Sequence, residues 1–239
     1  MRKFIKRAII NKTLAKLLIK PILRCHSKCY ALASRYSVIL NNGIHPKHRI
    51  LKYKEWFLEN IEPRWTILDI GFNTGMLPCM LAQKAKFVYG IEINDEYVSI
   101  AKTRYANDNI EYICADATTY NYASCKLIDC ITMSNVLEHI EGRVDFLKRI
   151  IRQVNWAREE QKRFLFRVPQ IDREWLVLYK KEMGVEYLLD STHYIEYTLE
   201  SFTKEMDEAG IRIINADTHF AEIYAVCEAS SELRFSHTK

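Results

Sequence analysis

The residues of this chain best suited to hold a small ligand fall in one stretch, residues 66–75, which read TILDIGFNTG. An apolar run with a single carboxylate, Asp69, ends at Gly71 and is followed by Asn73 and Gly75. Gly71 lets the backbone turn with no Cβ in the way, and asparagine tolerates left-handed dihedral angles well. Gly75 lets a ligand or the strand lie close to the following helix, whose first N–H groups favour an anionic group. The stretch therefore predicts a buried strand, a tight turn and a helix start.

Two further carboxylates follow apolar runs. Glu92 lies about 20 residues beyond Gly71, the distance at which an α/β fold places the end of its second strand beside the first turn. A carboxylate at that place can accept hydrogen bonds from both ribose hydroxyls of an adenosine. Asp116 follows a third apolar run in the same way, although an ordinary aspartate in a turn or at a helix N-cap would give the same pattern.

The turn does not fit a nicotinamide dinucleotide. That fingerprint needs glycine at the first, third and sixth positions, where this chain has Gly71, Asn73 and Met76. A nicotinamide site is therefore disfavoured, and an adenosine-containing ligand of another kind is expected.

The chain resembles the class I S-adenosylmethionine-dependent methyltransferases in three features: Asp69 with its glycine turn, the carboxylates Glu92 and Asp116, and the segment SNVLEHI at 134–140. It has Asn73 in place of the family's middle glycine. The resemblance covers about residues 45–229. It implies an α/β, Rossmann-like methyltransferase fold with a mostly parallel sheet of about seven strands, the last antiparallel, and helices on both faces. It also implies S-adenosyl-L-methionine as cofactor and S-adenosyl-L-homocysteine as product. The cofactor-binding residues that it implies are Asp69, Gly71, Asn73, Gly75, Glu92, Ile93, Asp116, Ala117, Ser134 and Asn135.

Apolar runs in the sequence predict the strands that must position these residues. They predict strands at about residues 66–70, 87–93, 110–114, 127–133, 164–168, 211–214 and 223–227. Between the fifth strand and the next helix lies a long aromatic and charged segment, residues 169–198, where an acceptor lid is expected. The methyltransferase domain is expected over 45–239, preceded by a helical extension over 1–44.

Methyl transfer needs a general base only if the acceptor must lose a proton. His193 and His139 are the candidate bases, although His139 also suits a residue that opens a helix and bonds locally. The segment HPKHR offers cations for an anionic acceptor, and a solvated basic loop is an equal alternative. The candidate acceptor residues are His45, His48, Arg49, Arg173, Tyr194 and Tyr197.

Charge divides the chain unevenly. Residues 1–54 hold fourteen of the 35 Lys and Arg and none of the 30 Asp and Glu, although the net charge is only +5. Apolar residues between 4 and 22 fall at helical spacing with lysines on another face, so we expect a basic amphipathic helix that Pro21 ends or kinks, and a second helix at 30–44. Residues 1–28 could bind an anionic membrane surface, or pack on the domain itself or on a second copy in a homodimer. Nucleic acid is a less favoured partner.

Seven cysteines without a C-x-x-C pair indicate reduced thiols in a cytoplasmic protein, and no metal site is expected. Lysines interrupt every candidate apolar core, so we expect neither a spanning helix nor a signal peptide.

The sequence predicts methyl transfer to a small-molecule, glycan or lipid-linked acceptor, at oxygen. The signatures HPKHR, RVPQIDREW and THYIEYT also resemble a prokaryotic subgroup linked to surface polysaccharide, which places the protein in the cytoplasm or on the inner face of the membrane. The absence of an N-P-P-Y stretch argues against amino groups of DNA. An RNA methyltransferase and a non-catalytic adaptor that binds the cofactor remain the alternatives.

Overall fold

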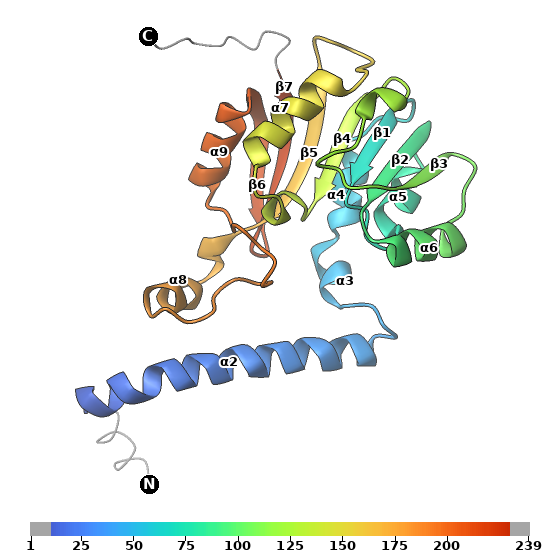
Figure 1. The fold of residues 1–239 in the computed structure, drawn as a ribbon. Helices are drawn as coiled ribbons and strands as arrows, with labels where there is room; N and C mark the ends of the chain where they lie inside the picture. Colours follow the sequence, from blue (N-terminus) through green and yellow to red (C-terminus); the bar gives the residue numbers. More distant parts are fainter. Residues whose placement is uncertain (1–10, 230–239) are drawn as a thin grey trace, which may run out of the picture. The chain divides into compact units, whose positions relative to one another are not determined.

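The computed structural model describes residues 11–229, which form two compact units (Figure 1). One unit contains the described residues up to Lys52 together with Asp172–Leu189. The other contains Tyr53–Ile171 and the described residues from Asp190 onward. The expected acceptor lid is therefore divided, because its middle belongs to the same unit as the N-terminal helix.

The second unit is built on one seven-stranded sheet with the order β3-β2-β1-β4-β5-β7-β6. Only β7 runs antiparallel to its neighbours, β5 and β6. The predicted Rossmann-like methyltransferase fold is thereby confirmed. The strands are β1 Thr66–Ile70, β2 Phe87–Glu92, β3 Ile110–Cys114, β4 Cys130–Ser134, β5 Lys162–Pro169, β6 Ile211–His219 and β7 Glu222–Ala229.

Parallel pairing brings the ends of four strands to one edge of the sheet. Ile70 in β1 pairs with Ile91 in β2 and with Met133 in β4, and Glu92 pairs with Cys114 in β3. The residues that follow these strands are those expected to bind a ligand. Ligands of open α/β sheets bind beyond the carboxyl ends of the strands, so this edge is the place to look.

Helices cover both faces of this sheet (Figure 1). Those of the second unit are α4 Tyr53–Glu59, α5 Met76–Leu81, α6 Asp95–Arg104, α7 Arg143–Gln153 and α9 Leu199–Glu208, with 3₁₀ turns η1 Tyr122–Ser124 and η2 Leu137–His139. One core cluster joins the sheet to α7 and α9 through residues such as Leu147 and Phe202. A separate cluster joins it to α4 and α5 through Phe57 and Leu81. The central strands are therefore buried on both sides, which explains their near-continuous apolar sequences.

Local signals set several element ends. Thr198 and Ser201 form a capping box at the start of α9, and Gly210 follows the helix with φ +77°, as expected of its C-terminal glycine. Helix α7 ends at Gln153, because the chain turns inward and buries Trp156.

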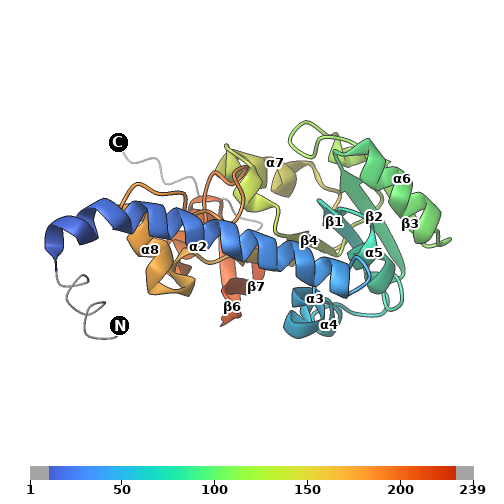
Figure 2. The same cartoon turned by 90° about the horizontal axis from the view of Figure 1, so that it is seen from below.

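The first unit contains α2 Lys12–Leu40, α3 Lys47–Leu51 and α8 Trp175–Glu182, while the 3₁₀ turn η3 Ile171–Arg173 spans the boundary between the units. Helix α2 is continuous through Pro21, so the expectation of two helices with a break is wrong. Proline removes one backbone hydrogen bond, and the many turns on either side keep the helix intact. Figure 2 shows α8 beside α2, and Lys180 Nζ lies 3.3 Å from His26 Nδ1.

The part of the expected amphipathic helix that precedes residue 11 lies outside the described residues. Among the described helices, none combines the length and the apolar character that crossing a bilayer requires.

Candidate functional site

The turn after β1 has the backbone that the sequence predicts. Gly71, Asn73 and Gly75 have φ angles of +73°, +54° and +89°. A Cβ on Gly71 would lie 2.5 Å from Val136 Cγ2, and one on Gly75 would lie 2.6 Å from Ala101 Cβ. Both glycines are therefore required by contacts within the protein as well as by the left-handed backbone.

Asp69 lies at the carboxyl end of β1 and is only 1% exposed. Its Oδ1 accepts a 2.5 Å hydrogen bond from the Thr132 hydroxyl, while its Oδ2 is buried and has no hydrogen-bond partner among the described residues. Burial raises the pKa of Asp69 to about 7, and the hydrogen bond from Thr132 opposes that shift. An acceptor atom is thus held without a partner under the turn.

Glu92 joins the end of β2 to the turn. Its carboxylate accepts hydrogen bonds from the N–H of Asn73, at 2.9 Å, and of Asn94, at 3.0 Å. Each carboxylate oxygen can accept a further bond, so both remain capable of receiving a ribose hydroxyl. The neighbouring Ile93 is 67% exposed, which leaves an apolar surface of the kind that a flat ring covers.

Asp116 follows β3 at the same edge. Its Oδ1 accepts hydrogen bonds from the N–H and the hydroxyl of Thr118, both at 2.7 Å. The carbonyl of Ala117 accepts from Arg149 at 2.6 Å, so this loop has a defined conformation. Asp116 is partly exposed and can present its other oxygen to a ligand.

Ser134 and Asn135, at the end of β4, contact a buried ion pair. Arg167 and Glu222 are 3% and 6% exposed and form two hydrogen bonds of 2.6 Å. Arg167 also donates to Ser134 Oγ at 3.0 Å, and its guanidinium lies 4.2 Å from the ring centroid of Tyr53. Asn135 has φ +56° and a buried Oδ1 without a hydrogen-bond partner among the described residues.

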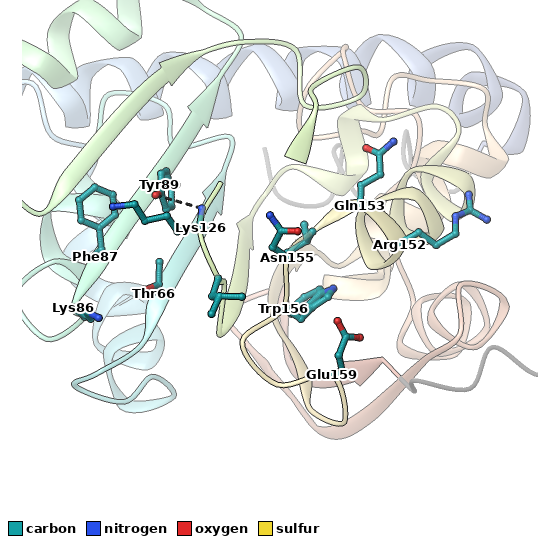
Figure 3. A pocket seen from close by; sticks show the side chains of 12 residues that line it. Thr66, Lys86, Phe87, Tyr89, Lys126, Arg152, Gln153, Asn155, Trp156 and Glu159 are labelled. Carbon is teal, nitrogen blue, oxygen red and sulfur yellow. Dashed lines mark hydrogen bonds between the residues drawn. The ribbon is translucent and has the colours of Figure 1, made fainter. Parts of the chain in front are cut away.

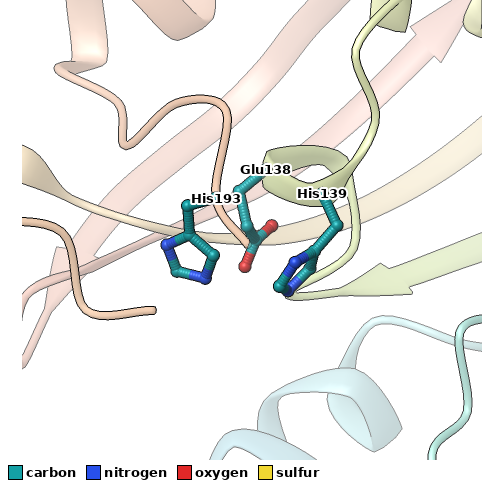
Figure 4. A group of neighbouring side chains, drawn as sticks. All are labelled: Glu138, His139 and His193. Atoms are coloured by element: carbon teal, nitrogen blue, oxygen red, sulfur yellow. The ribbon is translucent and has the colours of Figure 1, made fainter. Parts of the chain in front are cut away.

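The two candidate bases lie together in the second unit, beside Glu138 (Figure 4). The ring centroids of His139 and His193 are 4.7 Å apart. His193 Nδ1 lies 3.1 Å from a carboxylate oxygen of buried Glu196, and His139 Nδ1 lies 2.9 Å from Thr192 Oγ1. Burial, with help from His193, lowers the pKa of His139, while burial raises the pKa of Glu138 to about 8.

The acceptor candidates divide between the units. His45, His48, Arg49 and Arg173 belong to the first unit. There His45 bonds to Ser34 at 3.0 Å through Nε2, and Arg173 donates to the carbonyl of Tyr187 at 3.2 Å.

Tyr194 and Tyr197 belong to the second unit, and Tyr194 is 60% exposed. Tyr197 is fully buried, and its hydroxyl donates to Glu205 at 2.6 Å. Tyr197 is therefore a core residue whose hydroxyl fastens α9, and its contact with the acceptor stays a prediction.

Sequence reasoning did not select Arg167, Glu222 and Glu138 as site residues. Arg167 interrupts the apolar run at 164–169 and Glu222 precedes the apolar run at 223–227, and a charge in or beside such a run is the available signal. Glu138 lies inside the segment SNVLEHI, next to a residue that was selected. Its complete burial is a property of the fold that no local pattern contains.

A separate groove of about 860 Å³ lies at the other end of the strands (Figure 3). Thr66 and Phe87, which line it, are the first residues of β1 and β2, whereas Asp69 and Glu92 are at the opposite ends. This groove is therefore distinct from the edge that carries the turn.

A protein-family model described as a methyltransferase domain matches residues 68–155. N-methyltransferase 4 of Papaver somniferum is 34% identical over 106 residues, which cover 42% of this chain and 29% of that protein. The chain spans less than half the length of the curated relatives it matches.

Solved structures share the fold at low identity. A chain from the complex of the Haloferax volcanii Trm112 methyltransferase activator with a putative methyltransferase has a TM-score of 0.63 and 12% identity, covering 77% of this chain and 92% of that chain. Magnesium protoporphyrin IX methyltransferase from Synechocystis, with bound S-adenosylhomocysteine, has a TM-score of 0.56 and 18% identity, covering 77% and 83%. The fold is that of the class I S-adenosylmethionine-dependent methyltransferases. S-adenosylmethionine is the cofactor that the matched domain and this fold support.

Proposed function

We propose that this protein is a methyltransferase that uses S-adenosylmethionine to methylate an oxygen of a small-molecule, glycan or lipid-linked acceptor. The observation that carries the proposal is that two groups of residues lie along one edge of the sheet. The first group is the glycine turn with Asp69 and Glu92, and the second is a polar cluster made of Glu138, His139 and His193. One part suits an adenosine-containing cofactor and the other suits the activation of a hydroxyl group.

The residues at the turn fit the cofactor. Asp69 offers a buried oxygen without a partner among the described residues, and each oxygen of Glu92 can accept one further hydrogen bond, next to the exposed Ile93. The bound cofactor would supply a methyl group on a cationic sulfonium. The protein's part is to align the acceptor and to exclude water, and positioning alone is worth about 7 to 11 kcal/mol in favourable cases.

The histidines fit an acceptor that must lose a proton. Glu196 holds His193 through its Nδ1 and leaves Nε2 as the atom that can take the proton. His139, whose pKa is lowered by burial, stays neutral at physiological pH and can act in the same way. A sugar or phenol hydroxyl needs such a base, whereas an unprotonated amine does not.

Cell extract incubated with cofactor labelled in its methyl group tests the proposal. Label should enter the lipid, glycan or small-molecule fraction, and the labelled product should carry it as an O-methyl group when it is identified by NMR. Label in RNA alone would favour an RNA methyltransferase, with the basic residues holding phosphates. Cofactor binding without label in any fraction would favour a non-catalytic adaptor.

We also propose that α2 places the enzyme on an anionic membrane surface, at its cytoplasmic face. Leu17 and Ile22 are 69% and 57% exposed, and Lys12, Lys16 and Lys20 lie on the same helix. Exposed apolar and basic side chains on one helix suit a lipid surface better than RNA, which needs charge without apolar area. Each basic residue near such a surface adds about 1 kcal/mol.

Co-sedimentation with vesicles tests the membrane proposal. The chain should bind vesicles that contain anionic phospholipid and should not bind neutral ones. Replacing Leu17 and Ile22 by serine should weaken binding, while replacing the partly buried Ser27 by alanine serves as a control on the same helix. Equal binding to neutral vesicles, or binding unchanged by the serine substitutions, would contradict it.

A further inference from the structure

Glu138, His139 and His193 form a compact set of potential metal ligands. One ligand atom from each of the three residues lies within 4.8 Å of the others. Figure 4 shows the carboxylate of Glu138 between the two imidazole rings. The first two residues come from η2, after β4, and the third comes from the loop that follows Leu189, so the fold brings together groups far apart in sequence.

Glu138 is the unusual member of this set. Its side chain is completely buried, and neither of its oxygens has a hydrogen-bond partner among the described residues. A buried carboxylate without a partner is costly, because it loses its hydration and gains nothing in exchange. A cation bound between Glu138 and the histidines would supply the missing interaction.

The hydrogen bonds around the two histidines determine which ring nitrogen is available. A carboxylate only accepts, so His193 Nδ1 carries the proton in its 3.1 Å contact with Glu196 and the lone pair is on Nε2. The hydroxyl of Thr192 donates to Asp190 at 2.8 Å, so it must accept from His139 Nδ1 at 2.9 Å. His139 therefore also has its lone pair on Nε2.

This arrangement is the one that metal-binding histidines usually have. Their second nitrogen donates to a carboxylate or another oxygen, which orients the ring and strengthens the ligand. The surrounding charge is also suitable. Arg167, the charge that interacts most strongly with Glu138, is already paired with Glu222, and the other charged neighbour, Glu196, is acidic.

We propose that Glu138, His139 and His193 bind a divalent first-row transition metal ion. Two imidazoles and one carboxylate suit Zn²⁺ and, more weakly, Mn²⁺, whereas Mg²⁺ prefers a site made only of oxygen ligands. Three protein ligands leave a coordination position open. Resting on the proposed function, that position would take the acceptor oxygen and lower its pKa, so that its proton passes to water before the methyl group arrives. With the metal bound, the two histidines would act as ligands and not as the base. The site was not expected from the sequence, because its members are distant there.

Titration of the metal-depleted chain with Zn²⁺, Mn²⁺ and Mg²⁺ by calorimetry tests the site directly. Seven cysteines could bind Zn²⁺ elsewhere, so the protein should carry serine at Cys25, Cys29 and Cys114, which are exposed. One Zn²⁺ per chain should bind, Mn²⁺ more weakly, and Mg²⁺ not at all. Absence of Zn²⁺ binding would overturn the proposal.

Variants locate the binding. Glu138→Gln and, separately, His193→Ala should lose the Zn²⁺ site, and Glu196→Gln should weaken it by about 10- to 100-fold through loss of its hold on His193. The matched control is His219→Ala, because His219 is also paired with a carboxylate, Asp217, at 2.8 Å, but is exposed and outside the cluster. Undiminished Zn²⁺ binding in both Glu138→Gln and His193→Ala would overturn the assignment.

Binding of S-adenosylhomocysteine, measured on the same proteins, separates this proposal from the proposed function. Retained binding by the variants shows that they are folded. If Zn²⁺ binds at the cluster and S-adenosylhomocysteine does not bind, the metal site stands and the methyltransferase proposal fails. If S-adenosylhomocysteine binds and Zn²⁺ does not, the metal site fails alone.

Discussion

Replacing Asp69 by asparagine should change how the stability of the protein depends on pH. The Asp69 carboxylate is 1% exposed, its Oδ2 has no hydrogen-bond partner among the described residues, and burial raises its pKa from 3.8 to about 7. Asparagine has nearly the same shape and can still accept from Thr132, but it cannot ionise. The substitution therefore removes the titration and leaves the packing in place.

The raised pKa gives the direction and size of the effect. Between pH 3.8 and about 7 the folded state holds a proton on Asp69 that the unfolded chain has released. The free energy of unfolding therefore falls as pH rises, by about 1.4 kcal/mol per unit, and stops falling above the folded-state pKa. Between pH 5 and 8 the wild type should lose about 3 kcal/mol that Asp69→Asn does not lose. The asparagine N–H₂ lacks a partner and costs about 1 to 3 kcal/mol at every pH, which shifts the curve without bending it.

Urea unfolding of both proteins at several pH values, in constant salt and without cofactor, measures this difference. Other groups titrate equally in the two proteins, so only the difference between their unfolding free energies is used. Asp108→Asn is the control, because Asp108 is an exposed carboxylate in a turn. A difference between the wild type and Asp69→Asn that stays constant from pH 5 to 8 would refute the reasoning.

Three further predictions concern residues of the sheet-bearing unit, the last with a comparison glycine in the other unit. Glu92→Ala should weaken binding of S-adenosylhomocysteine by about 1.5 to 3 kcal/mol, measured by calorimetry, and unchanged affinity would remove Glu92 from the site. Glu222→Gln should cost about 3 to 5 kcal/mol of unfolding free energy, because it leaves the buried Arg167 without its partner. The exposed pair Lys204–Glu208 gives the contrast, since Glu208→Gln should cost less than about 1 kcal/mol. Gly75→Ala should destabilise more than Gly184→Ala in urea unfolding. Both glycines have positive φ, but only at Gly75 does the added Cβ meet another atom, at 2.6 Å, and equal losses would mean that this contact relaxes.

The turn was predictable because its information is local. Positive φ at Gly71, Asn73 and Gly75 follows from residue types within five positions, and the strand before it is apolar on both faces. The mostly parallel sheet with an antiparallel last strand was expected from the resemblance to a family rather than from any residue pattern, and the strand order comes from the structure. What the residues could not reveal is that Gly71 and Gly75 are also fixed by Val136 and Ala101, which approach from distant segments.

The polar cluster depends on contacts that sequence spacing does not contain. The antiparallel pairing of β5 and β7 places Arg167 opposite Tyr224, two residues from Glu222, within reach of its carboxylate. A backbone hydrogen bond of 2.8 Å from the N–H of Tyr194 to the carbonyl of Glu138 holds the loop with His193 beside η2. Each of these residues has an ordinary alternative when read alone. These residues become neighbours only through the register of β5 and β7 and because the chain returns to the sheet-bearing unit after Leu189.

The segment Asp172–Leu189 leaves and re-enters the sheet-bearing unit at one point. The N–H of Ile171 donates to the carbonyl of Tyr197 at 2.8 Å, and the N–H of Tyr197 donates to the carbonyl of Pro169 at 2.9 Å, so the two ends are joined by backbone bonds. The buried Tyr197 strengthens this junction, which explains why an aromatic residue of the expected lid lies in the core. His193 stands a few residues from the junction, and the segment itself belongs to the unit that contains α2. The chain therefore leaves the unit of the candidate site and returns to it through one junction that backbone hydrogen bonds close.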